Sequence, residues 1–167
     1  MATEDFSAQS LRKRLHYNPD TGIFVWVESN GRRAYKGSVA GSAGSRGYIS
    51  ISIDGHKYKA HRLAWLYTHG AWPKDCIDHI NGNTSDNRIV NLRDVDRTTN
   101  QQNIRRAKIN NIASGFLGVK RMQNTSRWYA TIKLHGKSIY LGSHATPEEA
   151  HHAYLKAKRK LHQGCTI

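Results

Sequence analysis

The residues best suited to chemistry are Asp78 and His79, which stand side by side, followed twelve and twenty-one residues past the histidine by Asn91 and Asn100. A carboxylate and an amide oxygen are hard ligands that suit Mg²⁺ or Mn²⁺, and an adjacent imidazole can deprotonate water near neutral pH. A hairpin followed by a helix would bring Asp78 and His79 to face Asn100, and Asn91 could then tie the connecting loop together. The spacing therefore predicts metal-assisted chemistry, although an isolated Asp-His pair is usually solvated surface or a satisfied hydrogen bond.

The elements that must position these residues are short. Residues 10–15 are compatible with a short helix, and the turn residues at 18–22 lead into a strand at 23–27. The stretch 37–47 holds four glycines and three serines, which favours a mobile loop.

Strong local signals surround the next segment. Residues 48–53 alternate with period two, and Asp54-Gly55 is a two-residue hairpin signal that returns the chain through 56–59. Residues 60–69 indicate a helix closed by Gly70, with apolar side chains on one face.

The Asp-His pair lies in the most polar part of the chain. Residues 77–103 predict a short hairpin around the Asn-Gly-Asn loop 81–83, and then a polar segment that enters a helix near Thr98. Residues 105–114 are polar, basic and poor in large apolar groups, so we interpret them as a linker.

The pattern beyond Gly115 predicts three strands and a helix. Strands are expected at 117–122, at 128–134, where apolar and polar residues alternate, and around Ile139 and Leu141. An N-cap threonine, a proline at the first helical position and a glutamate three residues past the cap predict a helix that begins at Thr146. Its apolar residues form one stripe that can cover the sheet. They are Ala150, Ala153, Tyr154, Ala157 and Leu161.

Charge points to a polyanionic partner. The formal net charge is +14, and it is uneven: residues 1–104 carry +4 and residues 105–167 carry +10. Nucleic acid or an acidic membrane surface would satisfy this charge, and we favour nucleic acid. The chain has no run of 18 apolar residues and no signal-peptide layout at its first residues. We therefore expect an intracellular, cytoplasmic protein with double-stranded DNA as partner, and no membrane or small-molecule substrate.

The two cysteines, Cys76 and Cys165, form no CxxC pair. This argues against a disulfide framework and against a zinc site built from thiolates. Cys76 and His79 could form half of a zinc site, but no matching second pair exists. We expect no structural zinc.

A set of short motifs around the Asp-His pair resembles the HNH endonucleases, and more narrowly the phage and intron-encoded homing type with asparagine as the last motif residue. The resemblance covers about residues 10–104 and is specific because several motifs occur in order. They are Ala60-His61-Arg62-Leu63-Ala64-Trp65, Asp78-His79-Ile80-Asn81-Gly82-Asn83, Asp86-Asn87-Arg88, Asn91-Leu92-Arg93 and Asn100-Gln101-Gln102-Asn103.

The resemblance implies a role for each central residue. His79 is the general base, Asp78 and Asn100 bind one divalent metal ion, Mg²⁺ or Mn²⁺, and Asn91 orders the loop. One active site per chain predicts nicking by a monomer, with a weak dimer or sequential action needed to cut both strands.

Several nearby residues have two interpretations. His61 could support the metal site or touch phosphate, and a packed structural histidine is at least as compatible with its position. Arg62, Arg88 and Arg93 could clamp phosphates or form surface ion pairs, and Asn103 could support the site. His151 and His152 are adjacent in the expected helix and point in different directions, so we do not expect them to bind metal together.

The C-terminal block, about residues 114–164, resembles the Apetala-two or ethylene-response-factor (ERF) DNA-binding domain of plants, which also occurs fused to phage HNH nucleases. The matching segments are Gly118-Val119-Lys120-Arg121, Trp128-Tyr129-Ala130-Thr131-Ile132, Leu141-Gly142, Glu148-Glu149-Ala150 and Ala153-Tyr154. Such domains lay a three-stranded sheet in the major groove. The alternative is a solvated basic face. The expected DNA-binding residues are Lys120, Arg121, Arg127, Tyr129, Thr131, Lys133 and Tyr140.

Met122, Thr131 and Tyr140 depart from the plant pattern, in which Arg, Glu and Trp are usual, so the plant target sequence is not carried over.

The sequence thus predicts an α+β chain: a ββα-metal (HNH, His-Me finger) nuclease domain with an added hairpin region at 1–104, a linker at 105–114, and an ERF-type domain at 115–167. The predicted function is metal-dependent cleavage of DNA, as a homing-type or phage DNA-processing enzyme in a bacterial host. One alternative is a DNA-binding regulator that does not cut, and another is an RNA-binding or ribosome-associated basic protein.

Overall fold

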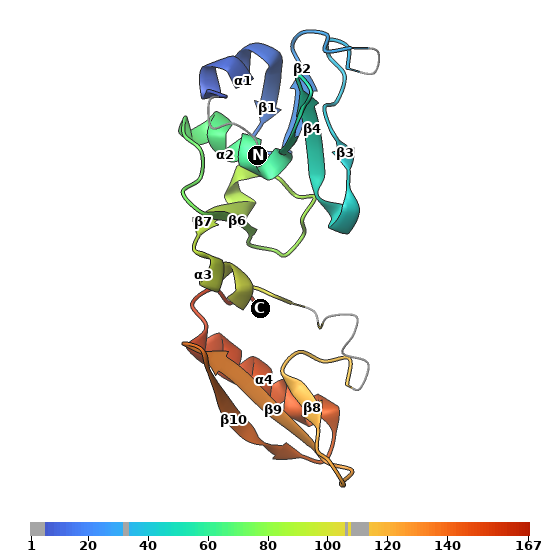
Figure 1. Ribbon diagram of the computed structural model, residues 1–167, viewed down its shortest axis with the longest axis vertical. Helices are drawn as coiled ribbons and strands as arrows, with labels where there is room; N and C mark the ends of the chain where they lie inside the picture. The colour runs from blue at the N-terminus through green and yellow to red at the C-terminus, as the bar shows by residue number, and fades with distance from the viewer. Residues whose placement is uncertain (1–5, 32–33, 106, 108–113) are drawn as a thin grey trace. The chain divides into compact units, whose positions relative to one another are not determined.

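The computed structural model describes residues 6–31, 34–105, 107 and 114–167. The chain divides into two compact units, Met1–Asp96 and Arg97–Ile167 (Figure 1). Both units combine helices with small antiparallel sheets, which confirms the predicted α+β class. The predicted domain boundaries stay a prediction, because positions 106 and 108–113 of the expected linker lie outside the described residues. Among the described residues, no helix is both long and apolar enough to cross a membrane.

The first unit begins with helix α1 (Ala8–Arg14) and a hairpin of β1 (Leu15–Asn18) and β2 (Ile23–Trp26). The Ser7 hydroxyl caps α1 by accepting from the Ser10 amide. The sequence predicted the helix and β2 but missed β1, whose first residue had been placed in the helix. The Asn18 side chain accepts from the amides of Asp20 and Thr21, and this local turn folds the two strands onto each other.

A three-stranded sheet follows, built from β3 (Ser42–Ala43), β4 (Ile49–Ile53) and β5 (His56–Lys59) in that order. The predicted hairpin between β4 and β5 is present, with Ile53 opposite His56. The stretch 37–47, expected to be loop throughout, contains β3 and the 3-10 turn η1 (Ser45–Gly47), because its backbone pairs with β4.

Helix α2 (Ala60–His69) covers this region and ends at Gly70 in the left-handed conformation, as predicted. Its residues Leu63, Ala64 and Leu66 are buried. They join one hydrophobic core with side chains from α1, β1, β2, β4 and β5, and with Ile77 and Leu92 further along the chain. The members with the least exposure include Leu11, Leu15, Phe24, Ile51 and Ile53.

The last strands of the first unit are β6 (Cys76–His79) and β7 (Leu92–Val95), which pair antiparallel. The prediction of a short hairpin around 81–83 was wrong, because the connection runs from 80 to 91 and ends in the 3-10 turn η2 (Ile89–Asn91). Asn81 and Asn83 each accept from the amide two residues ahead, so the polar side chains fold the backbone on itself before it can pair.

The second unit contains α3 (Arg97–Gln102), the strands β8 (Val119–Arg121), β9 (Trp128–Leu134) and β10 (Lys137–His144), and α4 (Pro147–Leu161). The sheet has the order β10-β9-β8, and α4 packs against it. Thr146 caps α4 by accepting from the Glu149 amide at 3.2 Å, as predicted. The buried core of this unit consists of Val119, Ala130, Ile132, Ala150 and Tyr154.

Candidate active site

Asp78 and His79 end strand β6, and both are buried, with 6% and 4% of their surface exposed. The strand pairs with β7 so that Asp78 lies opposite Arg93 and His79 opposite Leu92. Buried carboxylate and imidazole groups require polar partners, because burial without them costs several kcal/mol. The surroundings of these two side chains are therefore specific rather than incidental.

The Asp78 carboxylate is held by Arg93. Its Oδ2 accepts from Arg93 Nε at 2.9 Å and from Nη2 at 2.7 Å. Of the two interpretations of Arg93, the structure shows an ion pair, and this ion pair is made with the carboxylate of the site rather than with a surface residue.

His79 contacts Asn87 through its ring. His79 Nε2 and Asn87 Oδ1 are 3.4 Å apart. Burial lowers the pKa of His79, and the Asn87 hydrogen bond and the charges of Asp78 and Asp86 partly oppose that effect. A lowered pKa keeps the imidazole neutral near pH 7, which is the form that can accept a proton.

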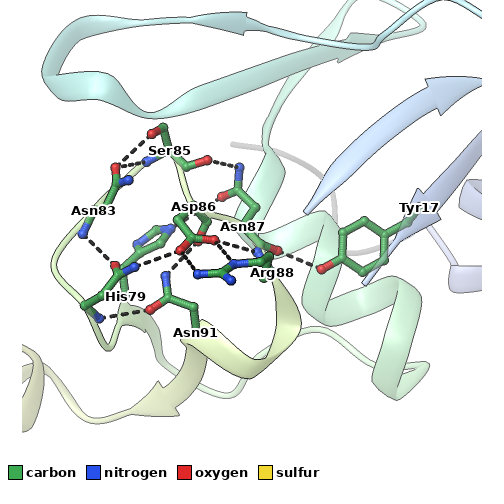
Figure 2. A network of polar contacts seen from close by, with 9 residues as sticks. Tyr17, His79, Asn83, Ser85, Asp86, Asn87, Arg88 and Asn91 are labelled. Carbon is green, nitrogen blue, oxygen red and sulfur yellow. Dashed lines mark hydrogen bonds and ion pairs between the residues drawn. The ribbon is translucent and has the colours of Figure 1, made fainter. Parts of the chain in front are cut away.

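Asn91 ties the 80–91 loop at two points (Figure 2). Its Oδ1 accepts from the Asn81 amide at 2.9 Å, and its Nδ2 donates to the Asp86 carbonyl at 2.8 Å. The side chain thus bridges the start and the middle of the loop. The role in the site that the resemblance implied for Asn91 stays a prediction.

Asp86 anchors the same loop through charge. Its carboxylate pairs with Arg88 at 2.6 Å and accepts from Asn81 Nδ2 at 2.7 Å. The hydrogen bond from Arg88 is the main reason that the pKa of Asp86 falls to about 2. Arg88, which was open to two interpretations, makes a local ion pair on the loop.

Asn87 and Tyr17 are parts of the site that the sequence did not identify. Asn87 is 3% exposed, and its carbonyl accepts from the Tyr17 hydroxyl at 2.7 Å. The only signal was that Asn87 lies in the Asp86-Asn87-Arg88 motif, to which no role was given. Tyr17 gave no signal, because it is 70 residues away in the sequence.

His61 lies against His79, with ring centroids 5.1 Å apart and the rings nearly perpendicular. Tyr48 contacts both rings, at 5.3 Å from His61 and 5.9 Å from His79. Among the described residues, His61 Nδ1 has no hydrogen-bond partner. Burial is the main reason that the pKa of His61 falls to about 3, and the charges of His79, Arg62 and Lys59 add to it.

The other predicted residues of this site are described within their own units. Arg62 donates to the Asp75 carbonyl at 3.2 Å and lies over the Trp72 ring. Asn100 lies on α3, in the second unit, and its pairing with Asp78 stays a prediction. Asn103 is buried in the second unit, where it accepts from the Thr166 hydroxyl.

One face of the second unit's sheet carries most of the predicted DNA-binding residues. Lys120 pairs with Tyr129, and Thr131 pairs with Tyr140, so these four side chains share the face that alternates with buried Ala130 and Ile132. The Tyr129 and Tyr140 rings are 6.2 Å apart, and Tyr140 is 59% exposed.

Lys133 extends this face, because it follows the same alternation as Tyr129 and Thr131. At the edge of this face, Arg127 donates a hydrogen bond to the Ser143 hydroxyl at 2.9 Å. Arg121 does not share it, because it pairs with Trp128 and its guanidinium lies over that ring. The sequence grouped Arg121 with the others only through the motif.

The side chains around Asp78 determine which metal ion could bind there. The described residues contain no group of three or more His, Cys, Asp and Glu side chains placed to hold a metal ion. A buried carboxylate with hard oxygen donors suits Mg²⁺ or Mn²⁺, which usually keep several waters and take one or two protein carboxylates. Asp78 fits such a sparse site, with the amide of Asn100 as the second protein ligand predicted.

Residues 58–102 match the family model described as HNH endonuclease. The match covers less than half of the chain and includes α2, β6, β7 and α3, of which the last three occur in the order of a ββα-metal unit. No curated protein and no solved structure matches the chain significantly. The family match supports an HNH nuclease, a hydrolase class that acts on DNA and typically uses a divalent metal. The homing type and the C-terminal ERF-type fusion stay predictions.

Proposed function

We propose that the chain is a metal-dependent endonuclease that hydrolyses phosphodiester bonds of duplex DNA and cuts one strand at a time. The observation that carries the proposal is the buried Asp78-His79 pair at the end of β6, with Asn91 bracing the loop beside it, inside the segment that matches HNH endonucleases.

Each group has a chemical role in this proposal. His79 takes a proton from the attacking water, which its lowered pKa favours because the imidazole is then neutral. Asp78 and Asn100 would hold one Mg²⁺ or Mn²⁺ ion, with Arg93 orienting the carboxylate. When bound, the ion supplies positive charge to the scissile phosphate and to the departing oxygen. Asn91 holds the 80–91 loop in place beside β6.

The second unit would hold the enzyme on DNA through the sheet face of Lys120, Tyr129, Thr131, Lys133 and Tyr140. Its basic character fits phosphate contacts, and two tyrosines at the centre fit base or sugar contacts in a groove. If about six phosphates are neutralised, the log-log salt slope of binding should be roughly −5. Covalent linkage of the two units adds affinity by effective concentration.

One site per chain favours nicking by a monomer. We also propose that the enzyme acts inside the cell, in homing or in phage DNA processing. The net charge of +14 supports a nucleic acid as partner.

The test is conversion of supercoiled plasmid to the nicked form in Mg²⁺ or Mn²⁺, with and without chelator. We expect nicking that requires metal, disappears in His79→Ala and survives in the control His16→Ala, which changes an exposed histidine of β1. DNA binding without nicking by the wild type would select the regulator instead. Preference for RNA in a competition assay would select the RNA-binding alternative.

A further inference from the structure

Which His79 nitrogen can accept a proton depends on which of the two already carries the N–H. A neutral imidazole has one N–H and one lone pair, and only the lone pair can accept a proton. A hydrogen bond to one nitrogen decides which form is populated. One such contact joins His79 Nε2 and Asn87 Oδ1, which are 3.4 Å apart.

The direction of that bond follows from the other end of the Asn87 amide. Asn87 Nδ2 donates to the Ser85 carbonyl at 3.3 Å, and a carbonyl can only accept. The amide is therefore oriented with its oxygen toward His79, as Figure 2 shows. An amide oxygen also only accepts, so a hydrogen bond between the two side chains requires the His79 proton on Nε2, which leaves the lone pair on Nδ1.

Asn87 is itself held by a residue from outside the HNH match. The Tyr17 hydroxyl, on β1, donates to the Asn87 carbonyl at 2.7 Å in a buried environment. The turn beside β1 also packs here: a Cβ on Gly22 would lie 2.5 Å from the Arg88 amide nitrogen. The N-terminal hairpin thus supports the part of the loop that contacts His79.

We propose that Asn87 is a positioning residue that holds His79 in the tautomer protonated on Nε2, and that Tyr17 fixes Asn87 in place. This inference rests on the proposed role of His79 as the base, and it assigns Nδ1 as the atom that accepts the proton from water. The N-terminal hairpin therefore serves the reaction although it lies outside residues 58–102.

The test observes the His79 ring directly by ¹⁵N NMR of the metal-free protein at about pH 8, where the imidazole is neutral. His79→Ala assigns the signals. We expect an Nε2–H proton protected from exchange in the wild type, its loss in Asn87→Leu, and its retention in Asn87→Asp, which keeps an acceptor. Thr84→Val is the matched control, because the Thr84 hydroxyl, on the same loop, donates to the Arg46 carbonyl rather than to Ser85, Asn87 or His79.

Tyr17→Phe is the second variant, and it keeps the aromatic ring while removing the donor. We expect faster exchange of the same Nε2–H proton. A wild-type spectrum with the proton on Nδ1 would overturn the proposal even if Asn87→Leu does not fold. Equal loss of the signal in Thr84→Val would also overturn it.

Kinetics provide a separate readout. For plasmid nicking, we expect Asn87→Leu to lower kcat by roughly 10- to 100-fold with KM nearly unchanged, and Asn87→Asp to restore much of it. If no variant nicks, including the wild type, but the NMR signal responds to Asn87 as expected, then the proposed function fails and the positioning role stands. If the wild type nicks and the signal does not respond, the positioning role fails alone.

Discussion

Replacing His61 with phenylalanine should make the first unit more resistant to acid. His61 is 8% exposed, its Nδ1 has no partner among the described residues, and its pKa is lowered from 6.5 to about 3. As the pH falls, this histidine is protonated in the unfolded chain while it is still neutral in the folded protein, so proton binding favours unfolding. Stability should therefore fall as the pH drops from about 6.5 toward 3.

The magnitude follows from the size of the shift. About pH 5 lies roughly 1.5 units below the ordinary pKa and well above the folded value, and each unit corresponds to about 1.4 kcal/mol. His61 should thus remove about 2 kcal/mol of unfolding free energy between pH 7.5 and pH 5. Its surroundings all act in one direction, because His79, Arg62 and Lys59 each disfavour a positive charge on the ring.

The assay is urea unfolding at both pH values for the wild type, His61→Phe and the control His56→Phe, which changes an exposed histidine of β5. The pKa of His79 is also lowered, so the wild type keeps a second source of acid sensitivity, and the difference between wild type and His61→Phe reports His61. A loss of stability in His61→Phe as large as in the wild type would refute the reasoning.

Three further predictions concern the second unit. Gly118→Ala should lower the free energy of unfolding in urea by about 2 kcal/mol or more, because φ is +73° and a Cβ would lie 2.0 Å from Tyr154 Cδ2. Gly136→Ala is the control, because a Cβ there would meet open space. A cost of Gly118→Ala no larger than that of Gly136→Ala would contradict the packing. Thr146→Ala should cost about 1 kcal/mol by loss of the α4 cap, while Thr125→Ala, on a turn, should cost less in the same unfolding assay. Lys120→Ala should weaken DNA binding and reduce the log-log salt slope of binding by about 1, as measured by fluorescence anisotropy. Lys156→Ala, on α4, should leave the slope unchanged. An equal effect of the two substitutions would rule out the sheet face as the DNA-binding surface.

Much of the fold could be predicted because its signals are local. The cap of α4 needs only Thr146, Pro147 and Glu149, and the alternation of β9 is set by residues within one strand. The left-handed end of α2 follows from Gly70 alone. These elements depend on interactions within a few residues, which a sequence pattern records.

The site was harder to predict because its contacts are not local. The motif identified Asp78, His79 and Asn91, but the support of His79 by Asn87 depends on Tyr17, and the burial of His61 depends on Tyr48 and β6. The long loop 80–91 was mistaken for a tight turn, because side-chain hydrogen bonds of Asn81 and Asn83 compete with strand pairing.

The most direct test of the account is the Mn²⁺ dependence of plasmid nicking, measured for the wild type, Asp78→Asn, Asn100→Ala and the control Asn30→Ala, a change on a loop of the first unit. We predict that Asp78→Asn and Asn100→Ala each raise the Mn²⁺ concentration needed for half-maximal nicking by at least about tenfold, while the control behaves as the wild type. Nicking by Asp78→Asn with an unchanged Mn²⁺ requirement would contradict the assignment of the buried Asp78-His79 pair as the nuclease centre.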